Sequence, residues 1–291
     1  MRKQARTTEE KLALVNRISL FVLVLSLLTV YSLVAWRMTG TLTPTLELLD
    51  GHAAVRFLDV GQGDCTLVTH GGRAVLVDAG PGNASDATAE LVHAYAPKID
   101  AFFVTHPHED HMGGAAEVLS RSRVGTLYLG PGESGERFYE NALAGAGERG
   151  TGIVRLEGPS VFVFGDITVE VLDTFGCPWD DLNDASLTLR VTVDGLSVLI
   201  GGDAGEAEET WLVEHGCDLR ADILQINHHG SASSTTERFL DCVSPRIAVI
   251  SCGKNNDYGH PTGAVLERLE IRGIAVRRTD REGTVVIRGG T

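Results

Sequence analysis

The residues best suited to chemistry lie in one short stretch that carries three histidines and an aspartate. The stretch reads THPHEDH (105–111) and directly follows an apolar run, AFFV (101–104), that is typical of a buried strand. In a loop between a strand and a helix, imidazole and carboxylate groups can converge on one point, as they cannot on a regular helix. These groups are ligands for Zn²⁺, Mn²⁺ or Fe²⁺. The sequence therefore predicts a metal site whose candidate ligands are His106, His108, Asp110 and His111.

The elements that must position this loop are short apolar strands that alternate with helical stretches from Ala54 onwards. This order predicts sheets covered by helices in an α/β layered domain. The expected strands cover 55–60, 65–69, 74–79, 101–104, 161–164, 168–172, 186–193, 196–200, 223–226, 247–251, 275–278 and 284–287, with a hairpin turn at Asp194-Gly195. The expected helices cover 86–95, 113–121, 205–214, 235–242 and 262–271. The Gly- and Glu-rich segment 130–152 is interpreted as a loop with at most one short helix.

The composition is that of a globular protein with an acidic body. Hydrophobic residues make up 43% and charged residues 22%, which excludes disordered, collagen-like and coiled-coil classes. Residues 1–17 carry five basic and two acidic side chains; without them and Arg37 the chain keeps 19 basic and 37 acidic side chains, a net charge of −18. Such a body argues against broad electrostatic capture of nucleic acid, but not against metal-assisted phosphodiester chemistry. The five cysteines lack a CxxC pattern and are expected to be core residues.

An uncharged stretch near the N-terminus predicts a membrane anchor. Residues 19–36 read SLFVLVLSLLTVYSLVAW and, as a helix, would span roughly 27 Å, enough for a bilayer core. We expect a basic cytoplasmic tail over 1–18, a transmembrane helix over 19–36, a linker over 37–53 and a catalytic domain over 54–291. The positive-inside rule places the N-terminus in the cytoplasm and the domain outside. A cleaved signal peptide is the alternative, although no clean cleavage site is present.

The pattern HxHxDH, followed by two glycines, resembles the metal-binding loop of metallo-β-lactamase-fold hydrolases. The resemblance covers residues 54–291 and implies an αββα sandwich with two divalent metal ions, Zn²⁺ or Mn²⁺. It implies that His106 and His108 bind the first metal, whereas Asp110 and His111 bind the second.

Three positions outside the loop 105–111 also match residues of this family. Asp203 in LIGGDAG matches the carboxylate that bridges the two metals. His229 in NHHGS matches the late histidine on the second metal, with His228 as the alternative. Asp78 in LVDAG matches the aspartate that supports the ligands from behind.

Four further strings resemble a narrower group, the hydrolase domain at the C-terminus of ComEC-type DNA-uptake channels and its free-standing relatives. They are FLDVGQGDC (57–65), NDASLTL (183–189), INHHGSASS (226–234) and GKNNDYGHP (253–261). The resemblance implies a role in competence and DNA uptake. The multi-helix channel of ComEC is not found in this sequence, so we do not expect DNA transport by this chain alone, and a separate membrane channel is an expected partner.

The chain departs from the wider family at one ligand of the first metal. That family supplies another histidine before the bridging aspartate, but residues 112–202 contain none. ComEC-type domains share this loss. Either the first metal is weakly held, or another side chain replaces the histidine, the candidates being Asp180, Asp181, Asn183 and Asp184.

Other candidate residues flank these motifs. Asp59 and Asp64 bracket a Gly-Gln-Gly turn and either support the metal loop or only shape the turn. Ser231 and Ser234 either contact substrate or, as we rather expect, cap the next helix. His260 precedes Pro261, a residue favoured in the first turn of a helix, and is expected to contact an anionic substrate there.

We predict metal-assisted hydrolysis of a phosphodiester. Bound metals would activate a water that Asp110 and Asp203 orient, and His228 or His260 would protonate or hydrogen-bond the leaving group. DNA outside the membrane is the leading substrate, and the acidic body leaves a small cell-envelope phosphodiester open. A lactonase or β-lactamase activity is less well supported because those enzymes keep the missing histidine. The alternative from another class is a non-catalytic, metal-containing, membrane-tethered assembly factor.

Overall fold

The computed structural model describes residues 22, 24, 26, 52–178 and 181–289. The chain divides into two units, 1–50 and 51–291, and all strands described below belong to the second. The predicted anchor lies outside the described residues except for Val22, Val24 and Ser26, which are helical. Within the described part of the chain, no helix is long and apolar enough to cross a membrane.

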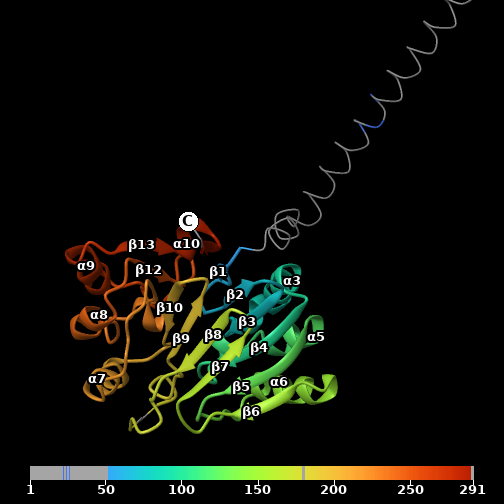
Figure 1. The fold of residues 1–291 in the computed structure, drawn as a ribbon, viewed down its shortest axis with the longest axis horizontal. Coiled ribbons are helices and arrows are strands. Elements are labelled where there is room, and N and C mark those ends of the chain that lie inside the picture. The colour runs from blue at the N-terminus through green and yellow to red at the C-terminus, as the bar shows by residue number, and fades with distance from the viewer. Residues whose placement is uncertain (1–21, 23, 25, 27–51, 179–180, 290–291) are drawn as a thin grey trace, which may run out of the picture. The chain divides into compact units, whose positions relative to one another are not determined.

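Two seven-stranded mixed sheets form the framework of the second unit (Figure 1). The first sheet has the order β14-β1-β2-β3-β4-β5-β6, in which the pairs from β3 to β6 are parallel and the others antiparallel. Its strands are β1 (Ala54–Phe57), β2 (Thr66–His70), β3 (Arg73–Val77), β4 (Lys98–Val104), β5 (Arg123–Leu129), β6 (Gly152–Arg155) and β14 (Val285–Arg288).

The second sheet has the order β13-β12-β11-β10-β9-β8-β7, in which the pairs from β10 to β13 are parallel and the others antiparallel. Its strands are β7 (Ser160–Phe164), β8 (Ile167–Val171), β9 (Leu189–Val193), β10 (Leu196–Ile200), β11 (Ile223–Gln225), β12 (Ile247–Ile250) and β13 (Ala275–Arg278). Asp194 and Gly195 both have positive φ in the tight turn between β9 and β10, as the predicted hairpin requires.

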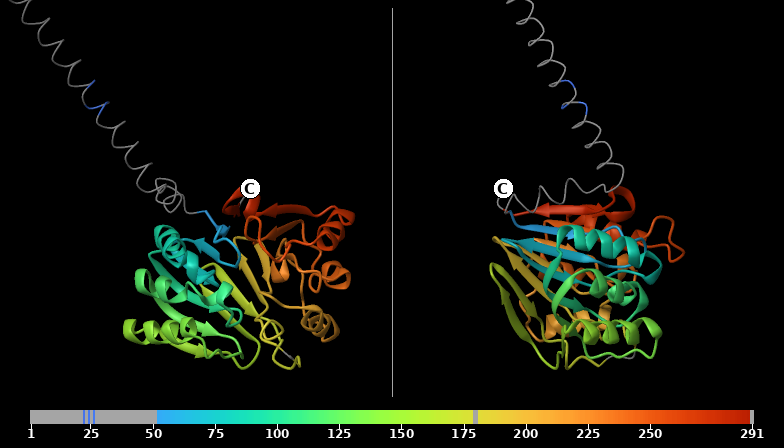
Figure 2. Two further views of the ribbon diagram at one scale, coloured as in Figure 1. Left: turned by 180° about the vertical axis from the view of Figure 1, so that it is seen from behind. Right: turned by 90° about the vertical axis from the view of Figure 1, so that its right-hand side faces the viewer.

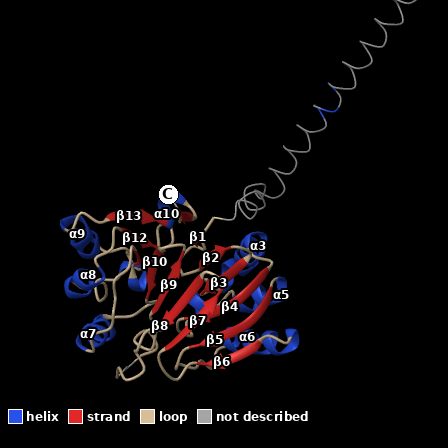
Figure 3. Ribbon diagram, viewed as in Figure 1, coloured by secondary structure: helices blue, strands red, loops and turns tan. Residues whose placement is uncertain are grey.

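Helices cover the outer face of each sheet, so the strands lie between two helical layers (Figures 2 and 3). The first sheet is covered by α3 (Ser85–Tyr95), α5 (Ala115–Arg121) and α6 (Arg137–Arg149), and the second by α7 (Glu206–Glu214), α8 (Glu237–Val243) and α9 (Gly263–Ile271). Short turns of helix are η1 (Gly82–Ala84), α4 (Glu109–Met112), η2 (Asn227–Gly230) and α10 (Thr279–Glu282). This arrangement confirms the predicted αββα sandwich.

Three apolar layers hold the sandwich together, one under each set of helices and one between the sheets. Successive side chains of a strand point to opposite faces, so a strand in this position must be apolar throughout. In β4, Phe102 packs under the helices, whereas Ala101 and Phe103 pack between the sheets. The run AFFV therefore belongs to a strand that is buried on both faces. This strand holds the start of the histidine-rich loop in a fixed position.

The sequence prediction was wrong for the region 123–155. Strands β5 and β6 were not expected, and the supposed loop contains the 13-residue helix α6. Its buried face consists of Tyr139, Ala142 and Ala146. Two of these residues are small, and the glycines around them obscure the helical periodicity of the sequence. The helix ends where Gly150 adopts a left-handed conformation (φ 68°).

The cysteines agree better with the sequence prediction, since all five are free and Cys65, Cys177 and Cys252 are buried.

The middle apolar layer makes a prediction about stability. Phe103 is fully buried there, with its ring centroid 4.6 Å from that of Tyr128. Phe103→Ala should lower the free energy of unfolding by about 3–5 kcal/mol, because it leaves a cavity between the sheets. Val163→Ala is the control, since that side chain is 66% exposed and should change stability by less than about 0.5 kcal/mol. Denaturant titration followed by circular dichroism measures both, and equal losses would contradict the assignment of this layer.

Candidate metal centre

The candidate ligands lie in loops that follow the C-terminal ends of strands from both sheets. Asp78 follows β3 and the loop 105–111 follows β4, while Asp203 follows β10 and His229 lies after β11. Strands β3 and β4 are parallel neighbours in the first sheet, as are β10 and β11 in the second. In each sheet, the C-terminal ends of the two strands therefore lie at the same edge. This is the edge at which open α/β sheets bind ligands.

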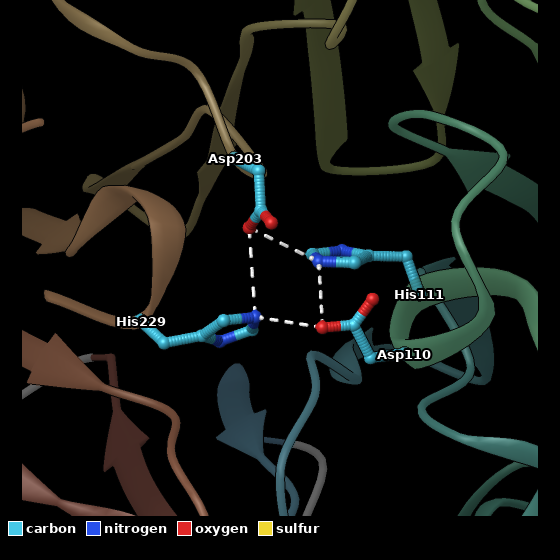
Figure 4. A group of neighbouring side chains, drawn as sticks. All are labelled: Asp110, His111, Asp203 and His229. Carbon is cyan, nitrogen blue, oxygen red and sulfur yellow. Dashed lines mark hydrogen bonds and ion pairs between the residues drawn. The ribbon is translucent and has the colours of Figure 1, made fainter. Parts of the chain in front are cut away.

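Four side chains, Asp110, His111, Asp203 and His229, form the larger of the two ligand groups that contain Asp203 (Figure 4). His111 Nε2 lies 3.1 Å from Asp203 Oδ1 and 4.0 Å from Asp110 Oδ2. His229 Nε2 lies 3.2 Å from Asp110 Oδ2 and 3.5 Å from Asp203 Oδ1. All four donor atoms point into the same small space, as ligands of one cation would. The structure thus places His229, rather than His228, beside the residues predicted for the second metal.

A second group consists of His106, His108 and again Asp203. His106 Nε2 lies 3.1 Å from His108 Nδ1 and 3.9 Å from Asp203 Oδ2. Asp203 therefore presents one carboxylate oxygen to each group, which is the geometry that a bridging ligand needs. The side chain is almost wholly buried, so its two oxygens have little access to water.

The residues of the larger group fit a divalent cation. His111 Nε2 and Asp203 Oδ1 are buried, and neither finds a hydrogen-bond partner of good geometry among the residues that the structure describes. Buried polar atoms are normally hydrogen-bonded. Two imidazole nitrogens and two carboxylates are a donor set that suits Zn²⁺ or Mn²⁺. The smaller group offers three donors, consistent with the absence of a histidine from 112–202. The described carboxylate candidates Asp181 and Asp184 do not join it, whereas Asn183 lines the pocket together with His108 and Asp203. Asp180 lies outside the described residues.

Charges in the centre are strongly coupled. Burial opposes a charge on His111 and His229, but Asp203 and the other nearby carboxylates raise the pKa of both well above the usual range. For Asp203, burial is outweighed by His111 and His229, which hold its pKa well below the usual value. Both histidines therefore retain protons that a cation must displace, and metal binding is expected to release protons and to strengthen as pH rises.

Asp78 and Asp64 support the two histidines of the larger group from behind. Asp78 Oδ2 lies 2.9 Å from His111 Nδ1 and accepts a hydrogen bond from Thr105 Oγ1. His229 Nδ1 lies 2.9 Å from the carbonyl oxygen of Ser251 and 3.4 Å from Asp64 Oδ1. These contacts leave Nε2 of each ring to face the centre, which is how outer partners orient metal-binding histidines.

The structure does not bring Asp59 to the centre. Its side chain is exposed and accepts a hydrogen bond from Gly61 N, so it shapes the turn, whereas the buried Asp64 reaches the site. Gly63 in the same turn is needed for close approach, since a Cβ there would lie 2.3 Å from the carbonyl oxygen of Asp110.

The expected helix caps were also wrong. Thr236, not Ser231 or Ser234, caps α8 by accepting a hydrogen bond from Phe239 N. Ser234 is buried and donates to the carbonyl oxygen of Asn227, so it braces the loop instead. Pro261 lies before Thr262, the N-cap of α9, and so is not in the first turn of that helix.

A pocket of about 160 Å³ opens beside the two groups. His228 and His260 both line it, and His228 Nε2 lies 3.6 Å from Asp203 Oδ2. Burial, together with His229 and His228, lowers the pKa of His260, which keeps this imidazole neutral near pH 7. Ser231 does not line this pocket. The remaining lining residues are Gln62, His108, Asp110, Asn183, Asp203, His229 and Tyr258.

Two supporting residues escaped the sequence prediction. Ser186 Oγ lies 3.2 Å from His106 Nδ1 and accepts a hydrogen bond from Asp203 N, so it connects the two sheets at the centre. Glu209 in α7 is fully buried and accepts hydrogen bonds from Asn227 Nδ2, Thr235 N and Thr236 N. The only sequence signal for Glu209 was a carboxylate on the apolar side of a helix.

Glu209 holds both ends of a strained loop. His228 and His229 have consecutive left-handed conformations, with φ of 49° and 53°, which are costly for residues other than glycine. The three hydrogen bonds of Glu209 join to residues immediately before and shortly after this pair. The conformation that directs His229 into the larger group is therefore maintained from α7.

We expect Glu209→Ala to weaken metal binding about 10- to 100-fold, because the loop that carries His229 loses its anchor. Glu206→Ala, on the exposed side of the same helix, is the matched control and should bind Zn²⁺ and Mn²⁺ like the unaltered protein. Metal titration by calorimetry measures both, with circular dichroism to verify folding. Unchanged affinity in a folded Glu209→Ala protein would show that the loop does not need this anchor.

Comparisons with known proteins agree with this centre. The family model described as "Metallo-beta-lactamase superfamily" matches residues 58–254 of this chain. ComE operon protein 3 of Bacillus subtilis is 31% identical over 82% of this chain and 33% of its own length. Competence protein ComA of Neisseria gonorrhoeae is 32% identical over 81% of this chain and 32% of its own length. The chain thus spans about a third of the curated relatives it matches.

Among solved structures, the metallo-β-lactamase fold protein YhfI of Bacillus subtilis superposes with a TM-score of 0.54. It is 12% identical and aligns with 81% of this chain and 100% of its own, which supports the fold alone. The matched residues 58–254 include all six candidate ligands and the strands β4, β10 and β11 that precede them. The chain belongs to the metallo-β-lactamase superfamily, whose members are in general metal-dependent hydrolases.

Proposed function

We propose that this protein is a membrane-anchored, metal-dependent phosphodiesterase or nuclease. The observation that carries the proposal is the position of Asp203, whose two carboxylate oxygens face two separate histidine groups. His106, His108 and Asp203 would hold one divalent ion, and Asp110, His111, Asp203 and His229 another. Such ions would supply a water of lowered pKa and would stabilise negative charge on the phosphodiester.

The chain's own residues have separate tasks around such a pair. Asp110 is held ionised: burial is outweighed by its hydrogen bond with His229 and by His111, so its pKa lies below the usual range. Its side chain is 30% exposed, and it can accept a hydrogen bond from the attacking water and hold that water in line. On the other side of the pocket, the neutral His260 and the neighbouring His228 can donate a hydrogen bond to the leaving oxygen.

The relatives favour DNA as the substrate. One curated relative is named a ComE operon protein and the other a competence protein, and both match the chain over four fifths of its length. A separate membrane channel protein is the partner we expect for an enzyme of this kind.

The pocket favours a second candidate, a small phosphodiester of the cell envelope. It measures about 160 Å³, and among the described residues that line it there is no lysine or arginine. Together with a body of net charge −18, this leaves the phosphate to be bound by the metals and a few neutral groups. A short substrate is compatible with such a site.

The activity test compares the unaltered chain with His108→Ala and Asp203→Ala, using His52→Ala as the control for an exposed histidine outside the centre. The substrates are bis(p-nitrophenyl) phosphate, a single-stranded oligonucleotide and a chromogenic β-lactam. Both phosphodiesters should be hydrolysed in Mn²⁺ or Zn²⁺, and each ligand substitution should reduce kcat by more than about 100-fold. Chelation should abolish turnover and readdition of metal should restore it.

Two results would overturn this assignment. Phosphodiester cleavage that survives both substitutions would place the activity elsewhere. Stoichiometric metal without turnover of any substrate would favour the alternative, a non-catalytic metal-containing assembly factor tethered to the membrane.

The proposed topology needs its own measurement. Residues 19–36 are expected to anchor the chain, with the N-terminus in the cytoplasm and residues 54–291 outside. An alkaline phosphatase fused after Thr291 should be active, and green fluorescent protein at the same position should be dark when exported through the same route. The opposite pattern would reject the outside location, and recovery of the fusion in the soluble fraction would reject the anchor.

A further inference from the structure

Tyr258 is unusual among the exposed side chains of the protein. It is 71% exposed, and in the described part of the chain it is the only aromatic residue among the large apolar side chains with high exposure. An exposed tyrosine alone needs no explanation. This one, however, lines the pocket beside the candidate metal centre, where a substrate must lie.

Aromatic rings form a continuous path from Tyr258 to the bridging carboxylate. The ring of Tyr258 stacks on His260, with 5.8 Å between centroids and 24° between planes. His260 lies edge-on to His228, again 5.8 Å between centroids. His228 Nε2 in turn lies 3.6 Å from Asp203 Oδ2. A flat group resting on Tyr258 would therefore be attached close to the phosphate that the centre acts on.

The loop that carries Tyr258 is held in place before any ligand arrives. Asn256 Nδ2 donates hydrogen bonds to the carbonyl oxygens of Gly253 and His260, and Asn256 Oδ1 accepts one from His260 N. Gly253 N donates to Gln62 Oε1, which fastens the loop to the turn beside the metal loop. A preformed platform costs little conformational entropy when a ligand binds.

We propose that Tyr258 and His260 form a stacking subsite for an unpaired nucleobase next to the scissile phosphate. The proposal rests on the phosphodiesterase function and narrows its substrate class to single-stranded nucleic acid. Every base has a π-face, and stacking on an aromatic side chain contributes about 1–3 kcal/mol per base without regard to sequence. Since the described lining contains no lysine or arginine, the site can gain affinity from this uncharged contact while it gains little from the phosphate backbone.

A quaternary ammonium head group is the competing ligand for an exposed tyrosine. Such cations are bound in cages of several aromatic rings. In the pocket, Tyr258 is the only phenol or indole ring, and its neighbours His260 and His228 are imidazoles, so the described lining provides a platform rather than a cage. The flat geometry favours a base.

The kinetic test uses the full-length protein with Tyr258→Leu, Tyr258→Phe and a control, Ile271→Ala, at an exposed apolar residue outside the pocket. For a short single-stranded oligonucleotide, Tyr258→Leu should raise KM about 5- to 150-fold with kcat little changed, because stacking contributes equally to ground and transition states. Tyr258→Phe should restore the KM of the unaltered protein. An abasic oligonucleotide with the same backbone should show no such difference between variants.

A binding measurement separates this inference from the proposed activity. In EDTA, where no hydrolysis is expected, the fluorescence of 2-aminopurine in a single-stranded oligonucleotide should be quenched by the unaltered protein and by Tyr258→Phe, but not by Tyr258→Leu. Quenching without turnover in metal would reject the phosphodiesterase function and retain the subsite. Turnover with equal KM changes for intact and abasic strands would retain the function and reject the subsite. A KM change confined to glycerophosphocholine would assign Tyr258 to a head group.

Discussion

One buried carboxylate, Asp203, constrains the rest of the centre, because its two oxygens must serve two different groups of histidines. A shift of even half an ångström would favour one group over the other, so the backbone on both sides has to be rigid. The protein meets this requirement by taking Asp203 from one sheet and its histidine partners His106 and His111 from the other. The apolar layer between the sheets therefore sets the distances at the metal centre as well as the stability of the fold.

The same constraint explains the second ring of polar residues. Charges as deeply buried as these are costly unless each is paired and hydrogen-bonded. The carboxylates of Asp78 and Asp64 contact Nδ1 of His111 and of His229, respectively. Ser186 connects His106 to the backbone of Asp203. Glu209 also contributes, because its hydrogen bonds stabilise the left-handed conformations of His228 and His229, which direct His229 towards the centre. The strain in that pair is thus offset by a hydrogen-bond network that does not itself touch the substrate.

The part of the centre that is local in sequence could be predicted, and the part that depends on packing could not. His106, His108, Asp110 and His111 are visible because they share one loop, whereas Asp203 and His229 were found only through resemblance to a family. Asp59 and Asp64 look equivalent in sequence, and only the fold shows that one is exposed and the other buried. For the segment of helix α6, only a short helix within a loop was predicted, because glycines hide its periodicity, and β5 was missed because its short apolar run directly follows a helix. The role of Glu209 depends on a loop that is distant in sequence.

The acidic character of the body has a positive consequence for a site of this kind. A negative field repels a nucleic acid backbone, but it concentrates divalent cations around the carboxylates that bind them. A protein that neutralises few phosphates with lysine or arginine also gains little from counterion release. Recognition of the proposed phosphodiester would then be short-range, through bound metals and through the exposed ring of Tyr258. Net charge −18 and phosphodiester chemistry are therefore compatible, provided that the substrate presents one unpaired segment to the pocket rather than a long duplex to the surface.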